Sequence, residues 1–267
     1  MSVSPAVVLA PNPSPLTGRG TNTYLCADGG AALCIDPGPD DERHLAAILA
    51  AAEPLGRIGT VLLSHSHPDH RPLARALALR TGAVIRCKEP GRAEDGALPL
   101  DDGERVRARD IVLEAVATPG HAADHLCFWD PDTRTLFSGD HILQGMTTVI
   151  APPDGDMGEY MASLERVKQL RPHTILPGHG ARVDDAAALI DEYLVHRRER
   201  EAQVIAAAKE YGAPVAPISL VPAIYAQYPK ELWPYAAMSV QAHLDKLVKE
   251  GRALRVAGTD GPLYRVR

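Results

Sequence analysis

The chain has 267 residues, of which 45% are hydrophobic, and it carries a formal net charge of −6 at pH 7. This length suits one large domain, or a domain of roughly 200 residues with a small appendage. The negative charge argues against bulk binding of nucleic acid, and no apolar run approaches the ~20 residues that a membrane span requires.

The start of the sequence lacks a basic segment, and its apolar stretch is too short for a signal peptide. The cysteines show no CxxC spacing and lie in apolar, strand-like runs, which predicts buried free thiols at Cys26, Cys34, Cys87 and Cys127. We therefore expect a cytoplasmic protein that makes no contact with a membrane.

The first part of the sequence predicts an irregular loop and then strands that alternate with helices. Asp28-Gly29-Gly30 is a hairpin signature between strands 23–26 and 31–35. Asp40 or Asp41 can cap a helix that runs through 45–49. The order that follows is a strand at 61–64, a helix through 73–79, a strand at 83–87, a loop over 88–105 and a strand at 111–116.

The second part predicts a hairpin of strands 126–129 and 135–137, a helix over 158–170 and a strand at 174–176. A long helix over 184–211 ends at Gly212-Ala213-Pro214. Helices near 218–228 and 236–250 and a hairpin of 253–256 with 263–266, turning at 259–262, then form a winged-helix pattern. The predicted domains are 1–183, a connecting helix 184–212 and a winged-helix-like domain 213–267.

The strongest chemical signal is His65-Ser66-His67-Pro68-Asp69-His70, which directly follows the apolar strand Val61–Ser64. Open α/β sheets place their sites on loops at such strand ends. His65 and His67 are two residues apart and can bind one ion from the same side, while Asp69 and His70, beyond the turn at Pro68, can face a second ion. Imidazole and carboxylate ligands suit zinc, with iron or manganese as alternatives. A polar loop whose histidines cap a helix is the simpler alternative.

The same pattern recurs later in the chain, where a short apolar strand leads through a tight turn to a potential metal ligand. Thr118-Pro119-Gly120 leads to His121, Ser138-Gly139 leads to Asp140, and Pro177-Gly178 leads to His179. One metal centre at the loop edge of a sandwiched sheet explains these residues together with the first cluster.

With these motifs placed, the chain resembles the metallo-β-lactamase-fold superfamily. HxHxDH, TPGH, SGD and PGHG occur in the order of that family within residues 61–180. The long helix and the small C-terminal domain are similar to the beta-lactamase-like subfamily with a C-terminal winged helix, so the resemblance covers essentially the whole chain. It implies an α/β (α+β) fold class, namely an αββα sandwich followed by a winged-helix domain.

The resemblance also implies roles for the motif residues. His65, His67 and His121 would hold one divalent ion, Asp69, His70 and His179 would hold a second, and Asp140 would bridge the two. Zinc is the expected metal, with manganese or iron as alternatives. A metal-bridging hydroxide would attack the substrate, and Asp69 would orient that hydroxide or take its proton as the catalytic residue.

The implied function is a binuclear zinc hydrolase acting on a phosphodiester, in the manner of a single-strand endoribonuclease, or on a small ester or thioester. One alternative is a thioesterase of the hydroxyacylglutathione hydrolase type. Another is a winged-helix regulator that binds nucleic acid and carries a non-catalytic metal site. Aspartate at position 140 disfavours lactam hydrolysis, because true β-lactamases commonly have cysteine there. Homodimer formation and the substrate-binding residues stay open.

Several residues near the motifs have secondary interpretations. Arg71 could bind an anionic substrate or lie at the surface at a helix start, and Asp36 could orient a ligand histidine. His125 and His141 are interpreted as hydrogen-bonding or packing residues beside the centre. His173 could donate a proton. The histidines outside the motifs are expected to be structural or solvated: His44, His196 and His243.

The C-terminal segment raises the question of nucleic-acid binding. Residues 235–267 carry a net charge of +3 against −9 for the rest of the chain. Such an asymmetry would suit phosphate contacts, and aromatic residues nearby could stack on bases. A solvated helix and wing that act as a lid or a dimer contact give the same charge pattern.

Overall fold

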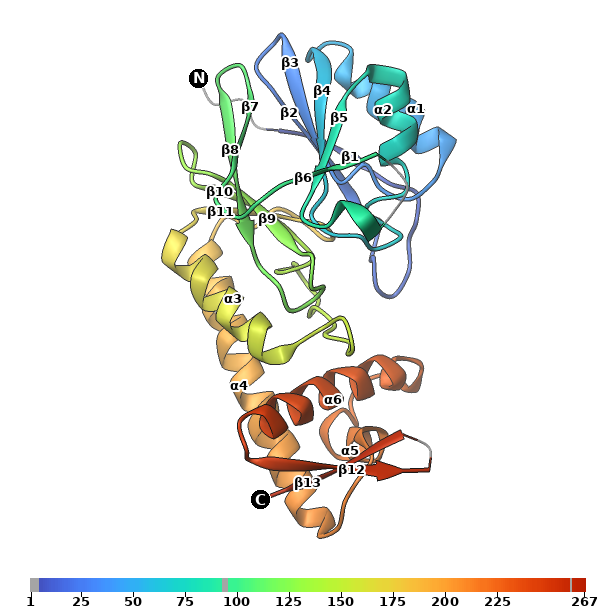
Figure 1. Ribbon diagram of the computed structural model, residues 1–267, viewed down its shortest axis with the longest axis vertical. Helices are drawn as coiled ribbons and strands as arrows, with labels where there is room; N and C mark the ends of the chain where they lie inside the picture. The colour runs from blue at the N-terminus through green and yellow to red at the C-terminus, as the bar shows by residue number, and fades with distance from the viewer. Residues whose placement is uncertain (1–4, 93–95, 260) are drawn as a thin grey trace. The chain divides into compact units, whose positions relative to one another are not determined.

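Figure 1 shows the computed structural model of the protein, which describes residues 5–92, 96–259 and 261–267. The chain forms two compact units. Unit 1 contains the chain up to Thr118 together with Asp124–Thr147 and Leu170–Ala187. Unit 2 contains Pro119–Ala123, Thr148–Gln169 and Ala188–Arg267. The division into sequence domains 1–183, 184–212 and 213–267 stays a prediction.

The first sheet of unit 1 has six strands in the order β1-β2-β3-β4-β5-β6. The strands from β1 to β3 are antiparallel, and those from β3 to β6 are parallel. Because β3 and β4 run in the same direction, the loops that follow them leave the same edge of the sheet. The strands are β1 (Ala6–Leu9), β2 (Asn22–Ala27), β3 (Ala31–Ile35), β4 (Arg57–Leu62), β5 (Val84–Cys87) and β6 (Leu98–Pro99).

The second sheet of unit 1 has five strands in the order β11-β10-β9-β8-β7. An antiparallel meander leads from β7 to β10, and β11 then pairs parallel to β10, with Phe137 opposite Leu176. The strands are β7 (Arg105–Ala108), β8 (Ile111–Ala117), β9 (Leu126–Asp130), β10 (Thr135–Gly139) and β11 (Thr174–Pro177).

Alternating side chains of the first sheet build two separate cores. Leu25, Cys34 and Val61 pack with helices α1 (Glu42–Ala52) and α2 (Ala74–Thr81), which lie on one face of the sheet (Figure 1). Their neighbours on the opposite face, such as Tyr24 and Leu33, pack against the second sheet. Because both faces of this sheet are covered, its central strands are mostly apolar, and the loop edge is left as the place for a polar site.

Local signals explain where the helices of unit 1 begin and end. The Asp41 carboxylate accepts hydrogen bonds from the backbone N–H groups of Arg43 and His44, which confirms the predicted cap of α1. Helix α2 ends at Gly82, whose φ of 72° is the left-handed conformation that glycine adopts without strain. A short 3₁₀ turn, η1 (Pro90–Arg92), follows β5.

Unit 2 contains the helices α3 (Met157–Leu170), α4 (Ala186–Tyr211), α5 (Pro217–Ile224) and α6 (Trp233–Lys249), the 3₁₀ turn η2 (Lys230–Leu232), and a hairpin of β12 (Ala253–Gly258) with β13 (Gly261–Val266). A core that includes Val204, Val221, Leu244 and Tyr264 joins α4, α5, α6 and the hairpin. The helices and the two-stranded wing agree with the predicted winged-helix arrangement. None of the helices in the described ranges is both long enough and apolar enough to cross a lipid bilayer.

Most of the predicted elements are confirmed, and the differences concern short or polar edge strands. The predicted loop over 88–105 is wrong where the chain forms β6 and begins β7, because the alternation of arginine and small apolar residues in β7 resembles a polar loop. Strand β1 is likewise missed. The predicted helix 218–228 ends earlier, at Ile224. The predicted turn 259–262 contains residue 260, which lies outside the described residues.

Candidate metal centre

Four predicted ligands of unit 1 lie together: Asp69, His70, Asp140 and His179. The Nε2 atom of His179 is 3.1 Å from Asp69 Oδ2 and 3.3 Å from Asp140 Oδ1. The Nε2 atom of His70 is 3.5 Å and 3.4 Å from the same two oxygen atoms. Residues that are up to 110 positions apart in the sequence therefore direct their polar atoms at one point.

The sheet topology explains how these residues meet. The loop with Asp69 and His70 follows β4, Asp140 follows β10, and His179 follows β11. Since β10 and β11 are parallel, their following residues leave the same edge of the second sheet. A backbone hydrogen bond of 2.8 Å from Gly178 N to Gly139 O holds these two turns together.

The distances within this group fit a bound divalent ion. Ligands about 2.1 Å from a tetrahedral ion lie about 3.4 Å from one another, and the four nitrogen–oxygen distances above range from 3.1 to 3.5 Å. The buried Nε2 atom of His70 has no hydrogen-bond partner within the described ranges. These are the distances expected of ligands that surround a cation, which would take the place of the Nε2 proton of His70.

Two glycines of the motifs leave room for this group. A Cβ atom at Gly178 would lie 2.6 Å from Asp140 Oδ1 and 2.8 Å from the His70 ring. A Cβ atom at Gly139, where φ is +47°, would lie 2.7 Å from the Ser64 side chain. Any larger residue would displace a ligand or its support, which is why the turns before Asp140 and His179 need glycine.

Asp36, at the end of β3, orients two of the candidate ligand histidines. Its Oδ2 atom accepts a hydrogen bond of 2.9 Å from His70 Nδ1 and one of 2.6 Å from Ser64 Oγ, and its Oδ1 atom accepts from Ser64 N. Because the Ser64 hydroxyl gives its proton to Asp36, it accepts from His65 Nδ1 at 2.9 Å. Both histidines therefore carry their proton on Nδ1 and present Nε2 to the site.

The orienting role of Asp36 was an expectation from its place at a strand end, and the structure confirms it. Ser64 was not identified from the sequence, although it directly precedes the histidine cluster. The carbonyl oxygen of Gly20 likewise lies 3.3 Å from His179 Nδ1, so His179 also presents Nε2 to the two carboxylates. In three candidate ligand histidines, His65, His70 and His179, Nδ1 therefore contacts a supporting oxygen atom and Nε2 is directed at the site.

His65 and His67 lie beside this group in unit 1. Their ring centroids are 4.4 Å apart, and the His65 ring is also 4.4 Å from the His70 ring. His65 is buried and His67 is partly exposed. These two residues provide two further imidazole groups next to the four ligands described above.

His121 lies on the segment Pro119–Ala123 of unit 2. Its Nδ1 atom is 2.8 Å from the carbonyl oxygen of Val149, which can only accept a hydrogen bond. His121 therefore carries its proton on Nδ1 and leaves Nε2 available as a ligand atom. This is the same arrangement that His65, His70 and His179 show in unit 1.

The charges of the four-residue group are strongly coupled. Burial lowers the pKa of His70, but Asp140, Asp69 and Asp36 raise it well above its ordinary value. The pKa of His179 is raised to about 9, because Asp140 and Asp69 outweigh its burial. The pKa of Asp140 is held well below its ordinary value against the effect of burial, through His70 and His179. A cation that binds here must displace protons from the two imidazoles.

The secondary candidates near the motifs lie in distinct places. His125 is buried, hydrogen-bonded through Nδ1 to Thr118 Oγ1, and its Nε2 accepts from Asp140 N at 3.2 Å, as expected for a supporting residue. His141 is also buried. Arg71 is not at the surface but buried, and its guanidinium donates to the carbonyl oxygens of Glu89 and Pro90. His173 is exposed.

The remaining histidines are structural, as expected. His44 is buried, and its Nε2 atom lies 2.9 Å from Thr23 Oγ1. His243 is buried in unit 2, where burial followed by nearby Arg197 and Lys246 lowers its pKa to about 3. His196 is partly buried, and the same causes, burial first and then the neighbouring arginines, lower its pKa to about 4.

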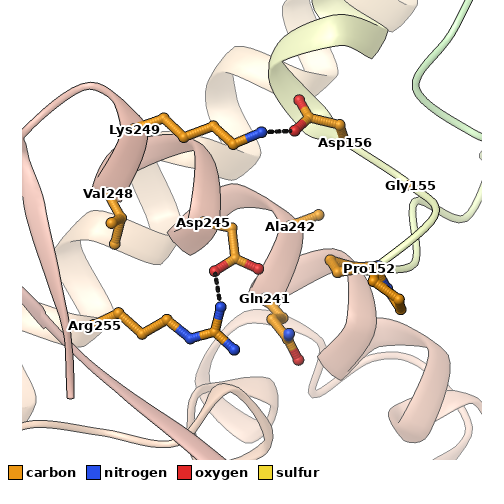
Figure 2. Close-up of a pocket in the computed structure, with 10 residues that line it drawn as sticks. Pro152, Gly155, Asp156, Gln241, Ala242, Asp245, Val248, Lys249 and Arg255 are labelled. Atoms are coloured by element: carbon orange, nitrogen blue, oxygen red, sulfur yellow. Dashed lines mark hydrogen bonds and ion pairs between the residues drawn. The ribbon is translucent and has the colours of Figure 1, made fainter. Parts of the chain in front are cut away.

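Four basic residues of the C-terminal segment pair with carboxylates. Lys246 pairs with Glu201 and Glu250 at 2.6 Å each, and Arg252 pairs with the same two residues at 2.9 Å. Two further pairs, Lys249 with Asp156 and Arg255 with Asp245, lie at a pocket of about 450 Å³ in unit 2 (Figure 2). Four of the six basic residues of 235–267 are thus paired, while the other two, Arg265 and Arg267, are exposed.

One side of this pocket is formed by α6, through Gln241, Asp245 and Lys249 among others. Figure 2 shows the loop with Pro152, Gly155 and Asp156 across from Gln241 and Asp245 of α6. The alternative of a winged-helix regulator that binds nucleic acid stays a hypothesis.

Comparison with known proteins agrees with these observations. Residues 16–179 match the model of the metallo-beta-lactamase superfamily, and residues 217–261 match that of the beta-lactamase associated winged helix domain. The chain is 33% identical over 255 residues to the beta-lactamase-like protein 2 homolog of Caenorhabditis elegans, a match that covers 91% of this chain and 84% of the relative.

Two further matches concern a thioesterase and a solved structure. The chain is 34% identical over 214 residues to an atrochrysone carboxyl ACP thioesterase of Aspergillus fumigatus, covering 77% of this chain and 65% of that protein. The crystal structure of a metallo-beta-lactamase family protein of Thermus thermophilus superposes with a TM-score of 0.82 at 22% identity, covering 98% of both chains. The αββα fold and the predicted family are thereby confirmed. The chain belongs to the metallo-beta-lactamase superfamily and is a metal-dependent hydrolase with a C-terminal winged-helix domain.

Proposed function

We propose that the protein is a binuclear zinc hydrolase that cleaves a small ester, with a thioester as the preferred substrate. The observation that carries this proposal is the group of Asp69, His70, Asp140 and His179, whose polar atoms have the mutual distances of ligands around one cation. His65 and His67 would hold the other ion, and His121 would complete that ligand set. Asp140 would contact both ions.

Two divalent ions supply a polarised carbonyl oxygen and a water molecule that is acidic near neutral pH. The residues of the chain would bind the ions, orient the water molecule and accept its proton. Asp69 has the more accessible carboxylate, since its side chain is 26% exposed against 11% for Asp140. Asp69 would therefore orient the attacking water and accept its proton, while Asp140 would stay among the buried ligands.

The donor set supports zinc as the metal. Imidazole Nε2 atoms together with carboxylate oxygens are borderline ligands that suit zinc, whereas an all-oxygen set would favour magnesium or calcium. The Nδ1 protons of His65 and His70 point to Ser64 and Asp36, which keeps these imidazoles neutral and basic when they bind a metal. Manganese or iron in the same ligands would be detected by metal analysis of the isolated protein.

Two observations support an ester or thioester rather than RNA as substrate. One is the relative that is named a thioesterase. The other is the pairing of Lys246, Lys249, Arg252 and Arg255 with carboxylates, which reduces the number of cations open to a phosphate backbone. A thioester carbonyl requires no such array of cations along the protein surface.

The proposal is tested with the purified protein loaded with zinc and offered an acyl thioester, single-stranded RNA and a cephalosporin. We expect turnover of the thioester that is lost in Asp69→Ala and kept in Asp132→Ala, which removes an exposed carboxylate of the β9–β10 turn. Cleavage of RNA without thioester turnover would contradict the proposed substrate class. Wild-type protein that binds no divalent metal would contradict the proposal as a whole.

A further inference from the structure

Helix α4 carries two buried arginines, Arg197 and Arg200, with which no carboxylate of the described residues forms an ion pair. Arg197 is 2% exposed and Arg200 is 6% exposed. In the described part of the chain no carboxylate pairs with either guanidinium, and the Nε atoms of both have no hydrogen-bond partner. Burying a cation without a carboxylate partner costs free energy of folding. The contacts that each arginine does make therefore indicate which part of the structure it stabilises.

Arg197 contacts the segment that fixes the ring of His121. Its Nη2 atom donates a hydrogen bond to the carbonyl oxygen of Thr148. The next residue, Val149, has the carbonyl oxygen that accepts from His121 Nδ1 at 2.8 Å. The guanidinium of Arg197 is therefore one peptide unit away from the group that sets the orientation of the His121 imidazole.

Arg197 also holds the opposite side of the same loop, through Tyr160 of α3. Its guanidinium carbon lies 5.0 Å from the centre of the Tyr160 ring. The backbone of Tyr160 packs so closely on Gly120 that a Cβ atom there would lie 2.3 Å from Tyr160 Cα. Gly120, at φ +132°, immediately precedes His121 in the chain.

Further bonds from α3 and the turn before it hold the segment before His121. Asp156 N donates to the carbonyl oxygen of Gly120 at 2.8 Å, and Ser163 Oγ donates to that of Pro119 at 2.8 Å. The histidine thus follows a loop anchored on α3 and donates to a carbonyl on the Thr148–Val149 segment. Arg197 contacts both segments that hold His121, through Tyr160 of α3 and through the carbonyl oxygen of Thr148.

We propose that Arg197 is a positioning residue for His121 and, through it, for the metal ion that His121 would hold together with His65 and His67. This inference rests on the proposed function, in which His121 is a metal ligand. Arginine suits the role because its planar guanidinium can donate to a carbonyl while it stacks on an aromatic ring, which a lysine ammonium cannot do in the same way. The buried and unpaired charge of Arg197 is retained because it holds the His121 imidazole in its ligand orientation.

Arg200 provides a matched control on the same helix. It is also buried, it donates to the carbonyl oxygen of Ile224 at 3.0 Å, and it stacks on Tyr225 with a distance of 4.1 Å to the ring centre. Arg200 makes none of the contacts with Thr148 or Tyr160. Arg197→Met and Arg200→Met therefore remove equivalent groups, and only the first change reaches the supports of His121.

The first measurement uses the metal-free protein and follows hydrogen exchange over residues 119–123 and 148–150. We expect exchange there to be about tenfold faster or more in Arg197→Met and unchanged in Arg200→Met. Equal rates in both variants would overturn the proposal. If Arg197→Met does not fold, Arg197→Lys against Arg200→Lys makes the same comparison with the charge retained.

The second measurement is a zinc titration of the full-length protein. We expect wild-type protein and Arg200→Met to bind two ions, and Arg197→Met to lose about 10- to 100-fold in affinity for one ion only, the loss typical of a supporting residue. Unchanged affinity for both ions in Arg197→Met would overturn the inference. Wild-type protein that binds no zinc would refute the proposed function, while the exchange measurement would still decide whether Arg197 positions His121.

Discussion

The two units differ in the groups that surround their buried charged side chains. In unit 1, His70 and His179 face Asp69 and Asp140, with Asp36 behind His70, so that positive and negative groups are matched. In unit 2, Arg197 and Arg200 are buried against backbone carbonyls and aromatic rings, and none of the described carboxylates pairs with them. Groups of the first kind can exchange their protons for a metal ion, whereas groups of the second kind hold loops and helices in place.

A second contrast lies within unit 2 itself. Two of its exposed cations, Lys249 and Arg252, are paired with carboxylates, whereas among the described residues no carboxylate pairs with the buried Arg197 and Arg200. The ion pairs reduce the positive charge that this part of the surface could offer to nucleic acid. The buried positive charge, in contrast, serves the geometry of the loop that carries His121.

The largest effect is expected from Asp140→Ala, which breaks the charge balance of unit 1. Asp140 lies within 3.4 Å of both His70 and His179, so its loss removes a candidate ligand and leaves Asp69 as the one carboxylate of the group beside the two imidazoles. We expect zinc to be lost and kcat/KM to fall by more than the 10- to 100-fold that supporting residues cost. Metal content after dialysis and steady-state kinetics measure this, with Asp132→Ala as the control. Retained activity would contradict the central position of Asp140.

A smaller effect is expected from Asp36→Asn. Asparagine tolerates the positive φ of 49° at this position, but its amide has only one acceptor oxygen for the donors of Ser64 and His70. We expect zinc affinity to fall by about 10- to 100-fold.

Ser64→Ala is the milder variant to compare with Asp36→Asn, because among the histidine contacts it removes only the hydrogen bond between Ser64 Oγ and His65 Nδ1. Its loss in zinc affinity should be smaller than that of Asp36→Asn. Competition with a chromogenic chelator measures both variants. An equal or larger loss in Ser64→Ala would show that Asp36 acts mainly through His65 rather than through His70.

The buried cations of unit 2 predict sensitivity to acid. The pKa of His243 is about 3 in the folded protein, below the ordinary value of about 6.5. The unfolded chain therefore binds a proton that the folded chain does not between these two values, and the free energy of unfolding falls as the pH drops below 6.5. The loss is up to about 1.4 kcal/mol per pH unit. Urea unfolding of the metal-free protein at pH 7 and pH 5 measures it.

His243→Leu tests the assignment of this acid sensitivity. The variant cannot take up the proton, so its free energy of unfolding should fall less between pH 7 and pH 5 than that of the wild type. An identical pH dependence in both proteins would assign the effect to other groups, of which His196, with its lowered pKa of about 4, is the first to examine.

The smallest effect is expected from Lys249→Ala. The Lys249 side chain is 67% exposed, so its pair with Asp156 is screened by water, and we expect the free energy of unfolding to change by less than about 0.5 kcal/mol. Lys246→Ala should cost more, because the Lys246 side chain is 17% exposed and lies between Glu201 and Glu250. Binding to single-stranded RNA should be unmeasurable with or without either change. A salt-dependent RNA affinity that falls in Lys249→Ala would contradict the interpretation that these ion pairs reduce the positive charge offered to nucleic acid.

The sequence predicts the elements that carry a strong local pattern. The hairpin at Asp28-Gly29-Gly30, the cap at Asp41 and the strand before His65 follow from residue types whose backbone preferences are unambiguous. The short edge strands β1 and β7 were missed because pairing with a neighbouring strand, rather than local preference, stabilises them.

The site was predictable to the extent that its ligands stand in motifs. His70, Asp140 and His179 follow strand ends and are recognisable in the sequence, and Asp36 could be suspected for the same reason. Ser64 and Arg197 could not be found in this way, since a hydroxyl just after a strand or an arginine in a long charged helix has many ordinary roles. Their functions depend on contacts between residues far apart in the chain, such as Ser64 with Asp36.

The most direct test is the metal content of the zinc-loaded wild-type protein, located by anomalous X-ray scattering. We predict two ions per chain, about 3.5–4 Å apart, with Asp140 in contact with both. A single ion, or ions that lie away from Asp140 and His179, would contradict the proposed centre.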